Sequence, residues 1–137
     1  MNRTVIVLVG SFASLVPAAA QVVRVSTPTF MADADRWVGR TVRVAALRCV
    51  DEPRGRIACG TSSGGRRLRV EGLALDFQTS TTVRRKLSAR CRTDLASASD
   101  ACTFDVEFKP LAVTREPSGA GSKTQAFRVK AQRINLF

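Results

Sequence analysis

Four cysteines constrain the fold of this chain more than any other feature of its sequence. They stand at Cys49, Cys59, Cys91 and Cys102, so each has another cysteine roughly ten residues away. A disulfide that closes a loop of this length adds about 2–3 kcal/mol of stability in the chain-entropy model. Zinc sites favour closer C-x₂₋₄-C pairs and redox sites favour C-x-x-C, and neither spacing occurs. An even cysteine count in a small exported chain is typical of disulfides. Of the three connectivities, spacing favours Cys49–Cys59 and Cys91–Cys102.

The N-terminus follows the three-part plan of a secretory signal. Arg3 gives a positive start, residues 5–16 form an apolar run, and residues 17–20 are Pro-Ala-Ala-Ala. The run is shorter than the 20 or so apolar residues that a spanning helix needs, and it contains Gly and Ser. We therefore predict a signal peptide over residues 1–20, cleaved after about Ala20, and a periplasmic or secreted protein. No second apolar run follows, so no transmembrane segment is expected in the mature chain.

The remaining residues, 21–137, have the length of one domain. The whole chain carries a formal net charge of +11, and the leader contributes one Arg and no acid. Such a charge favours anionic partners, which include nucleic acid, anionic lipid, lipopolysaccharide and acidic glycan. The charge has a second explanation, because scattered surface arginines keep a small protein soluble and GC-rich coding favours arginine. The sequence leaves both explanations open.

Alternating apolar residues predict strands on both sides of one helix. In residues 41–50 the apolar positions change parity after Ala45-Ala46, which indicates a bulge or sharp coil. A turn at residues 51–55 and a return strand at 56–61 would make a hairpin. A third strand is expected over residues 66–75, with Leu68 and Val70 facing inward and a second parity change at Gly72.

Residues 78–92 are typical of a helix, because Val83, Leu87 and Cys91 follow at steps of four. Residues 103–109 predict a strand with Phe104, Val106 and Phe108 inward, and residues 126–137 a last strand with Phe127, Val129 and Ala131 inward. A mobile loop is expected over residues 115–123. Residues 21–36 are interpreted as an N-terminal lead-in that ends in a turn or helical turn.

The predicted order is strand, strand, strand, helix, strand, strand. It indicates a mostly β fold, a five-stranded OB-like Greek-key barrel over residues 37–137 with one helix between strands 3 and 4 and two disulfides. The opening Asp35-Arg36-Trp37-Val38-Gly39-Arg40-Thr41-Val42 resembles that of small exported, periplasmic bacterial OB-fold proteins. This resemblance implies a binding or structural scaffold and does not specify a ligand. We expect Trp37 to plug the core.

Residue types that perform catalysis are scarce. The chain has no His and no Tyr, which removes Ser-His-Asp and Cys-His arrangements and His-based metal sites. The acid pairs Asp33/Asp35, Asp51/Glu52 and Asp105/Glu107 are interpreted as turn or solvated positions rather than a general acid–base pair. We therefore predict no enzymatic activity, no cofactor and no metal.

OB-folds usually bind ligands across the second and third strands and their loops. In this chain those elements carry the predicted anion patch, Arg54, Arg56, Arg66, Arg67 and Arg69. The flanking cations are Lys109, Lys123, Arg128 and Lys130. The two strands hold no aromatic residue on which a base could stack, and export separates the chain from most nucleic acid, so nucleic acid is the least favoured anion.

Two functions follow from these patterns. The first is an exported, non-enzymatic OB-fold binding or structural module that contacts an envelope protein. The alternative is a polyanion-binding module for lipopolysaccharide, acidic glycan or single-stranded nucleic acid, acting through the arginine patch.

Overall fold

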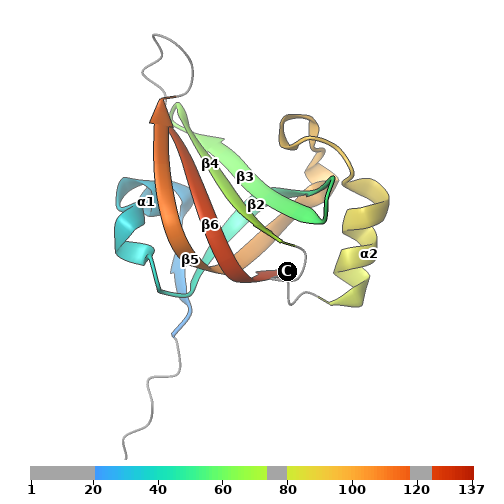
Figure 1. The fold of residues 1–137 in the computed structure, drawn as a ribbon, viewed down its shortest axis with the longest axis horizontal. Helices are drawn as coiled ribbons and strands as arrows, with labels where there is room; N and C mark the ends of the chain where they lie inside the picture. The colour runs from blue at the N-terminus through green and yellow to red at the C-terminus, as the bar shows by residue number, and fades with distance from the viewer. Residues whose placement is uncertain (1–20, 74–79, 118–124) are drawn as a thin grey trace, which may run out of the picture.

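The computed structural model describes residues 21–73, 80–117 and 125–137 (Figure 1). The predicted signal peptide, Lys123 and parts of the predicted helix and loop lie outside the described residues. The elements are β1 Val23–Val25, α1 Thr27–Ala32, β2 Val42–Glu52, β3 Arg56–Ser63, β4 Arg66–Leu73, α2 Thr81–Arg90, β5 Thr103–Pro117 and β6 Gln125–Leu136. Short 3₁₀ turns η1 (Ala34–Trp37), η3 (Leu95–Ser97) and η4 (Asp100–Cys102) connect them. The prediction of a mostly β fold is confirmed.

The strand pairings close on themselves. β2 pairs with β3, β3 with β4, β5 with β6 and β2 with β5, all antiparallel, while β4 and β6 are parallel. A sixth strand, β1, pairs in parallel with the start of β2. The prediction of five strands was therefore wrong, because the three residues of β1 are too few to show a period in the sequence.

A bulge near the middle of β2 lets this strand serve several neighbours. Its register with β5 shifts between Val44 and Leu47, and Ala46 has a positive φ of 59°. The Ala46 N–H donates to Asp105 Oδ1 at 3.2 Å. Val44 and Leu47 are both fully buried because the bulge restores the inward parity. The bulge expected from the parity change at Ala45-Ala46 is confirmed.

The segment before β2 packs into the core. Ser26 caps α1 by accepting a hydrogen bond from the Thr29 N–H, and Phe30 is fully buried. The Phe30 ring meets the Phe108 ring edge-on at a centroid distance of 5.7 Å. Trp37 is buried in the same cluster, as expected of a core plug. The expectation of a single helix was wrong, since α1 forms within the lead-in, ahead of the expected turn or helical turn, which corresponds to η1.

The inward faces expected for the other strands are confirmed. Leu68 and Val70 on β4, Phe104, Val106 and Phe108 on β5, and Phe127, Val129 and Ala131 on β6 are all buried. A further change of parity near the C-terminus was missed, although the apolar positions pass from Phe127, Val129 and Ala131 to Ile134 and Leu136. There Arg133 has a φ of 52°, and Ile134 and Leu136 return to the core.

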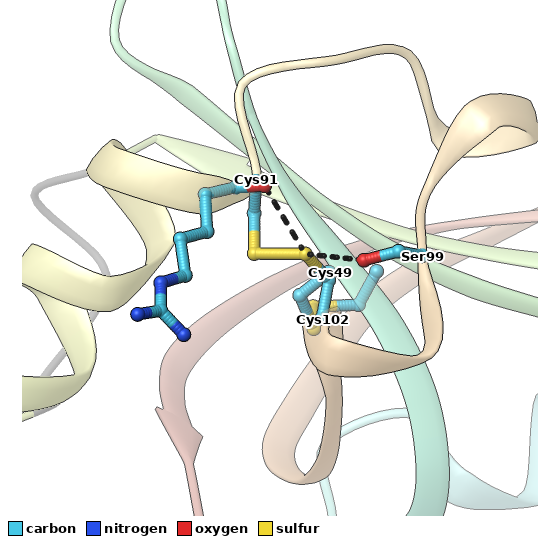
Figure 2. Close-up of a disulfide and its surroundings, with 6 residues drawn as sticks. Cys49, Cys91, Ser99 and Cys102 are labelled. Carbon is cyan, nitrogen blue, oxygen red and sulfur yellow. Dashed lines mark hydrogen bonds between the residues drawn. A yellow bond between two sulfur atoms is a disulfide. The ribbon is translucent and has the colours of Figure 1, made fainter.

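Both disulfides form as spacing indicated. Cys49 and Cys59 are register partners in the β2–β3 hairpin, with Cα atoms 4.0 Å apart. Cys91 joins the C-terminal end of α2 to Cys102 just before β5 (Figure 2). Ser80 caps α2 by accepting from the Val83 N–H, and Leu87 is the buried residue of this helix. The first bond thus joins two neighbouring strands of the sheet, and the second ties α2 to the segment that leads into β5.

Replacing Phe30 tests whether the lead-in is part of the folding unit. We expect Phe30→Ala to lower the free energy of unfolding by about 3–5 kcal/mol, because it leaves a cavity against Phe108. Chemical denaturation of residues 21–137 measures the change, with Arg24→Ala on the exposed edge of β1 as the control. A loss in Phe30→Ala no larger than the control's would mean that α1 folds independently of the sheet.

Candidate binding surfaces

The five predicted arginines do not form one patch. Arg54 lies in the β2–β3 turn and Arg56 begins β3, whereas Arg66 and Arg67 begin β4 directly after the Gly64-Gly65 turn. In the antiparallel register Arg56 lies opposite Leu73 and Ser63 opposite Arg66, so the two groups occupy opposite ends of the hairpin. At about 3.3 Å per residue the length of β3 separates them by roughly 23 Å.

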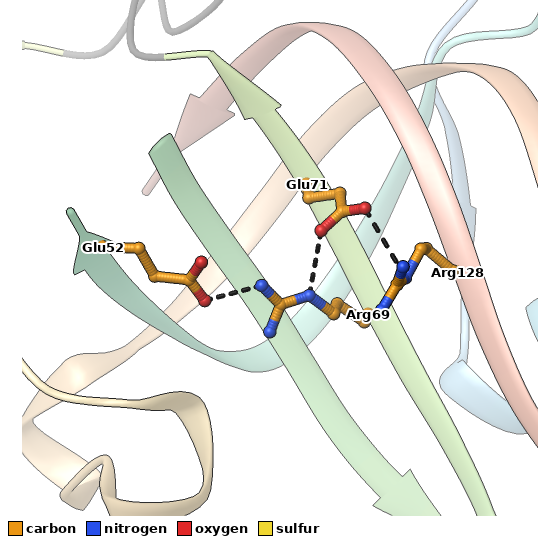
Figure 3. Close-up of polar contacts among 4 residues, drawn as sticks. All are labelled: Glu52, Arg69, Glu71 and Arg128. Atoms are coloured by element: carbon orange, nitrogen blue, oxygen red, sulfur yellow. Dashed lines mark hydrogen bonds and ion pairs between the residues drawn. The ribbon is translucent and has the colours of Figure 1, made fainter. Parts of the chain in front are cut away.

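Arg69 lies between these groups and is compensated by carboxylates. Its guanidinium contacts Glu52 Oε1 at 2.6 Å and Glu71 Oε2 at 3.0 Å, and Arg128 approaches Glu71 at 3.6 Å (Figure 3). Burial alone would lower the pKa of Arg69, but its hydrogen bonds to Glu71 and Glu52 outweigh burial and raise that pKa. Glu71 follows Arg69 by two residues, the spacing that puts both on one strand face, and this signal in the sequence was missed.

The flanking cations occupy neighbouring positions on the sheet. Arg128 is the register partner of Arg69, and Lys130 is the partner of Glu71. Lys109 lies on β5 opposite Gln132 and is half-buried. Glu71 is the one acid among these charges, and its contacts with Arg69 and Arg128 partly compensate the positive charge on β4 and β6.

The loop between α2 and β5 covers part of β3. A Cβ atom added at Gly60 would overlap the Leu68 carbonyl oxygen and lie 2.7 Å from Leu95 Cδ2. Leu95 belongs to η3, within the segment closed by the Cys91–Cys102 disulfide. The middle of the β3 surface, where an OB-fold ligand would be expected to rest, is thus occupied by the chain itself.

A hollow of about 640 Å³ lies where the end of β2 meets this loop. Its lining residues are Asp51, Glu52, Pro53, Arg92, Thr93 and Asp94. Arg92 lies 3.8 Å from Asp51, and hydrogen bonds from Ser97 hold the pKa of Asp94 below its usual value. Within residues 21–73, 80–117 and 125–137, no group of three or more His, Cys, Asp or Glu residues is arranged to hold a metal ion.

The helix α2 carries a second group of cations. Arg84, Arg85, Lys86 and Arg90 are all exposed, and its ten residues include no acid. The helix at residues 78–92 was predicted from its apolar residues alone, and these cations were not predicted as a site. Their signal was available in the sequence, because four cations without a carboxylate exceed what a solvated helix face requires.

A third surface surrounds the start of β2. The Val23 N–H donates to the Thr41 carbonyl at 3.1 Å, and the Gly39 N–H donates to the Pro110 carbonyl at 2.8 Å. These bonds bring together three segments that carry the exposed apolar residues Val22, Val23, Val38 and Leu111. The exposed fractions of these four residues run from 36% to 51%. We call these four residues the apolar rim. Among the described helices, none is long and apolar enough to cross a membrane.

No family model matches this chain, and no curated protein matches its sequence. An aspartyl-tRNA synthetase structure from Leishmania major Friedlin is 12% identical, with a TM-score of 0.43, over 91% of this chain and 22% of that chain. The aspartyl tRNA synthetase from Entamoeba histolytica is 14% identical, with a TM-score of 0.35, over 74% of this chain and 19% of that chain. The chain thus spans about a fifth of the length of each. At these TM-scores neither likeness bears on what this chain does.

The contact between Gly60 and Leu95 predicts a cost for any side chain at this position. We expect Gly60→Ala to lower the free energy of unfolding by about 1–3 kcal/mol, because the Leu68 backbone cannot move aside freely. Urea denaturation measures the loss, and Ser62→Ala on the same strand serves as the exposed control. Equal stability of the two variants would show that neither the Leu68 carbonyl nor Leu95 crowds the Gly60 position.

The ion pairs of Arg69 predict a structural effect that a neighbouring arginine lacks. Arg69→Gln leaves Glu52 and Glu71 without this partner, and we expect a loss of up to about 1 kcal/mol of unfolding free energy. Arg67→Gln removes the same charge from an exposed side chain and should change stability by less than about 0.5 kcal/mol. Equal losses of stability for Arg69→Gln and Arg67→Gln in thermal denaturation would show that the ion pairs of Arg69 do not stabilise the fold.

Proposed function

We propose that this chain is an exported, non-enzymatic binding module with an OB-like Greek-key barrel, and that it acts by contacting another protein of the cell envelope. The closed order β2-β3-β4-β6-β5, the parallel pairing of β4 with β6, and α2 between β4 and β5 support the barrel. The leader pattern and the two disulfides support export, because such bonds persist in oxidising compartments.

The observation that carries the protein-contact proposal is the open edge of β1. In a parallel ladder successive residues turn their N–H and C=O groups to alternate sides, so Val23 faces β2 and Arg24 faces away. Among the described residues, no other strand pairs with this edge. An open edge beside exposed apolar side chains is suited to pairing with an extended segment of another chain.

The chemistry of the rim specifies the partner further. Arg24 and Arg40 are exposed, and no acidic side chain in the described part of the chain forms an ion pair with either. A matching segment would be extended, apolar at alternate positions and acidic between them. The arginine patch supports the polyanion alternative less well, because Arg69 is compensated and the outer arginines lie at opposite ends of the hairpin.

Site-specific cross-linking in the native host tests the protein contact. A photoreactive residue placed at Leu111 or at Val38 should yield the same single adduct from the envelope fraction. The matched control is Ser88 on α2, which is also exposed but distant in the fold. Leu111→Glu should abolish the adduct formed from Val38, because it places a charge in the apolar rim.

Three results would overturn the proposal. Absence of an adduct at both rim positions would rule out the proposed protein contact. Equal labelling at Ser88 would show that the adducts come from nonspecific collisions. Recovery of the full-length precursor in the cytoplasm, with its first 20 residues attached, would remove the export on which the envelope partner depends.

A further inference from the structure

The helix α2 carries four cations and no acid, and it packs on the sheet through few buried side chains. Its cations are Arg84, Arg85, Lys86 and Arg90, which we call the α2 surface, and Leu87 is its buried residue. Lys86 and Arg90 are four residues apart, a spacing at which like charges repel. By the helical period they lie on the other side of the helix from Arg84 and Arg85.

Part of the α2 surface has the donors of an oxyanion site. Thr81, Arg84, Arg85 and Ser88 follow at helical spacing and share one face, and with Ala89 they line a hollow of about 450 Å³. Guanidinium groups and hydroxyls all donate hydrogen bonds to phosphate oxygens. Lys86 lies toward the sheet instead, with Nζ 5.3 Å from the Phe104 ring centroid.

Two arginines of this helix differ from the arginines of the sheet. On the sheet, Arg43 pairs with Asp105 and Arg48 with Asp100. Within the described residues, no acidic side chain forms an ion pair with Arg85 or Arg90. Because residues 81–90 also contain no acid, positive charge is concentrated on α2, and such a concentration favours an anionic partner.

We infer that the α2 surface docks the protein on anionic lipid headgroups through their phosphates. α2 bears no aromatic side chain on which a base could stack, which disfavours single-stranded nucleic acid. It also exposes no large apolar side chain, so the contact is electrostatic and reversible rather than inserted. The inference rests on the proposed export, which places the chain beside a membrane, but it does not depend on a protein partner.

Vesicle sedimentation of residues 21–137 with oxidised cysteines tests the docking. The probes are vesicles of phosphatidylcholine alone and vesicles with about 30% phosphatidylglycerol, in about 100 mM salt. We expect binding to the anionic vesicles only. Arg84→Gln/Arg85→Gln should weaken it by about 30-fold, since each cation near the surface contributes about fivefold.

Two variants serve as controls. Arg66→Gln/Arg67→Gln removes the same charge from an adjacent exposed pair at the β3–β4 turn and should weaken binding by less than about 3-fold. Arg84→Lys/Arg85→Lys keeps the charge and should retain most of the binding, because a lipid surface recognises charge rather than a fixed fork geometry. Circular dichroism of each variant checks that α2 still forms.

Several outcomes would overturn the inference. Equal losses in the Arg84/Arg85 and Arg66/Arg67 pairs would mean that binding reflects net charge alone, and no binding at all would remove the lipid partner. Tighter binding of a single-stranded oligonucleotide through Arg84 and Arg85 would make nucleic acid the ligand. Cross-linking from the apolar rim reports on the protein partner, so the two proposals fail separately.

Discussion

The closed sheet depends on the change of direction at the β2 bulge, where the Asp105 carboxylate meets the backbone. Asp105 accepts a hydrogen bond from the Ala46 N–H and lies 3.8 Å from Arg43, whose guanidinium is 4.0 Å from the Phe137 ring centroid. The bulge allows β2 to pair with β1 and β5 along its first half and with β3 along its second half. Without that change of direction the ring of pairings could not close, and the hairpins would form an open sheet. Asp105, which the sequence places on an ordinary solvated strand face, therefore lies at the point where β2 changes direction.

Long alternating segments and cysteine spacing made the inner faces and both disulfides predictable. Period-2 patterns in Phe104-Val106-Phe108 and Leu68-Val70 leave little choice of face once one side is buried. β1 and α1 could not be predicted in the same way, because three and six residues are too few for a period. Their structure comes from tertiary contacts, above all the packing of Phe30 against Phe108. The positive φ of Arg133, by contrast, was available in the sequence, because the apolar positions change parity there between Ala131 and Ile134.

The candidate site was less predictable than the fold, although part of it was available in the sequence. Arg56 and Arg66 stand within one short segment, but the extended strand β3 lies between them and carries them to opposite ends of the hairpin. The strands predicted over residues 56–61 and 66–75 already imply this division of the arginine patch, and the consequence was not drawn. Charge pairing across strands was hidden, since Glu52 reaches Arg69 from another strand. The helical period keeps neighbours in sequence close in space, so the cluster on α2 could also have been found from sequence.

The arrangement of the two proposed surfaces lets one molecule use both. α1, next to β1 and the apolar rim, and α2 lie on opposite sides of the strands (Figure 1). A helix resting on lipid headgroups would leave the β1 edge directed away from the membrane and open to an extended segment. The Cys91–Cys102 bond fixes the C-terminal end of α2 to the start of β5, so the cationic helix cannot swing independently of the sheet. Attraction to the lipid would then orient the whole module, and restricting the search to two dimensions would raise the encounter rate with a membrane-bound partner even where the edge itself binds weakly.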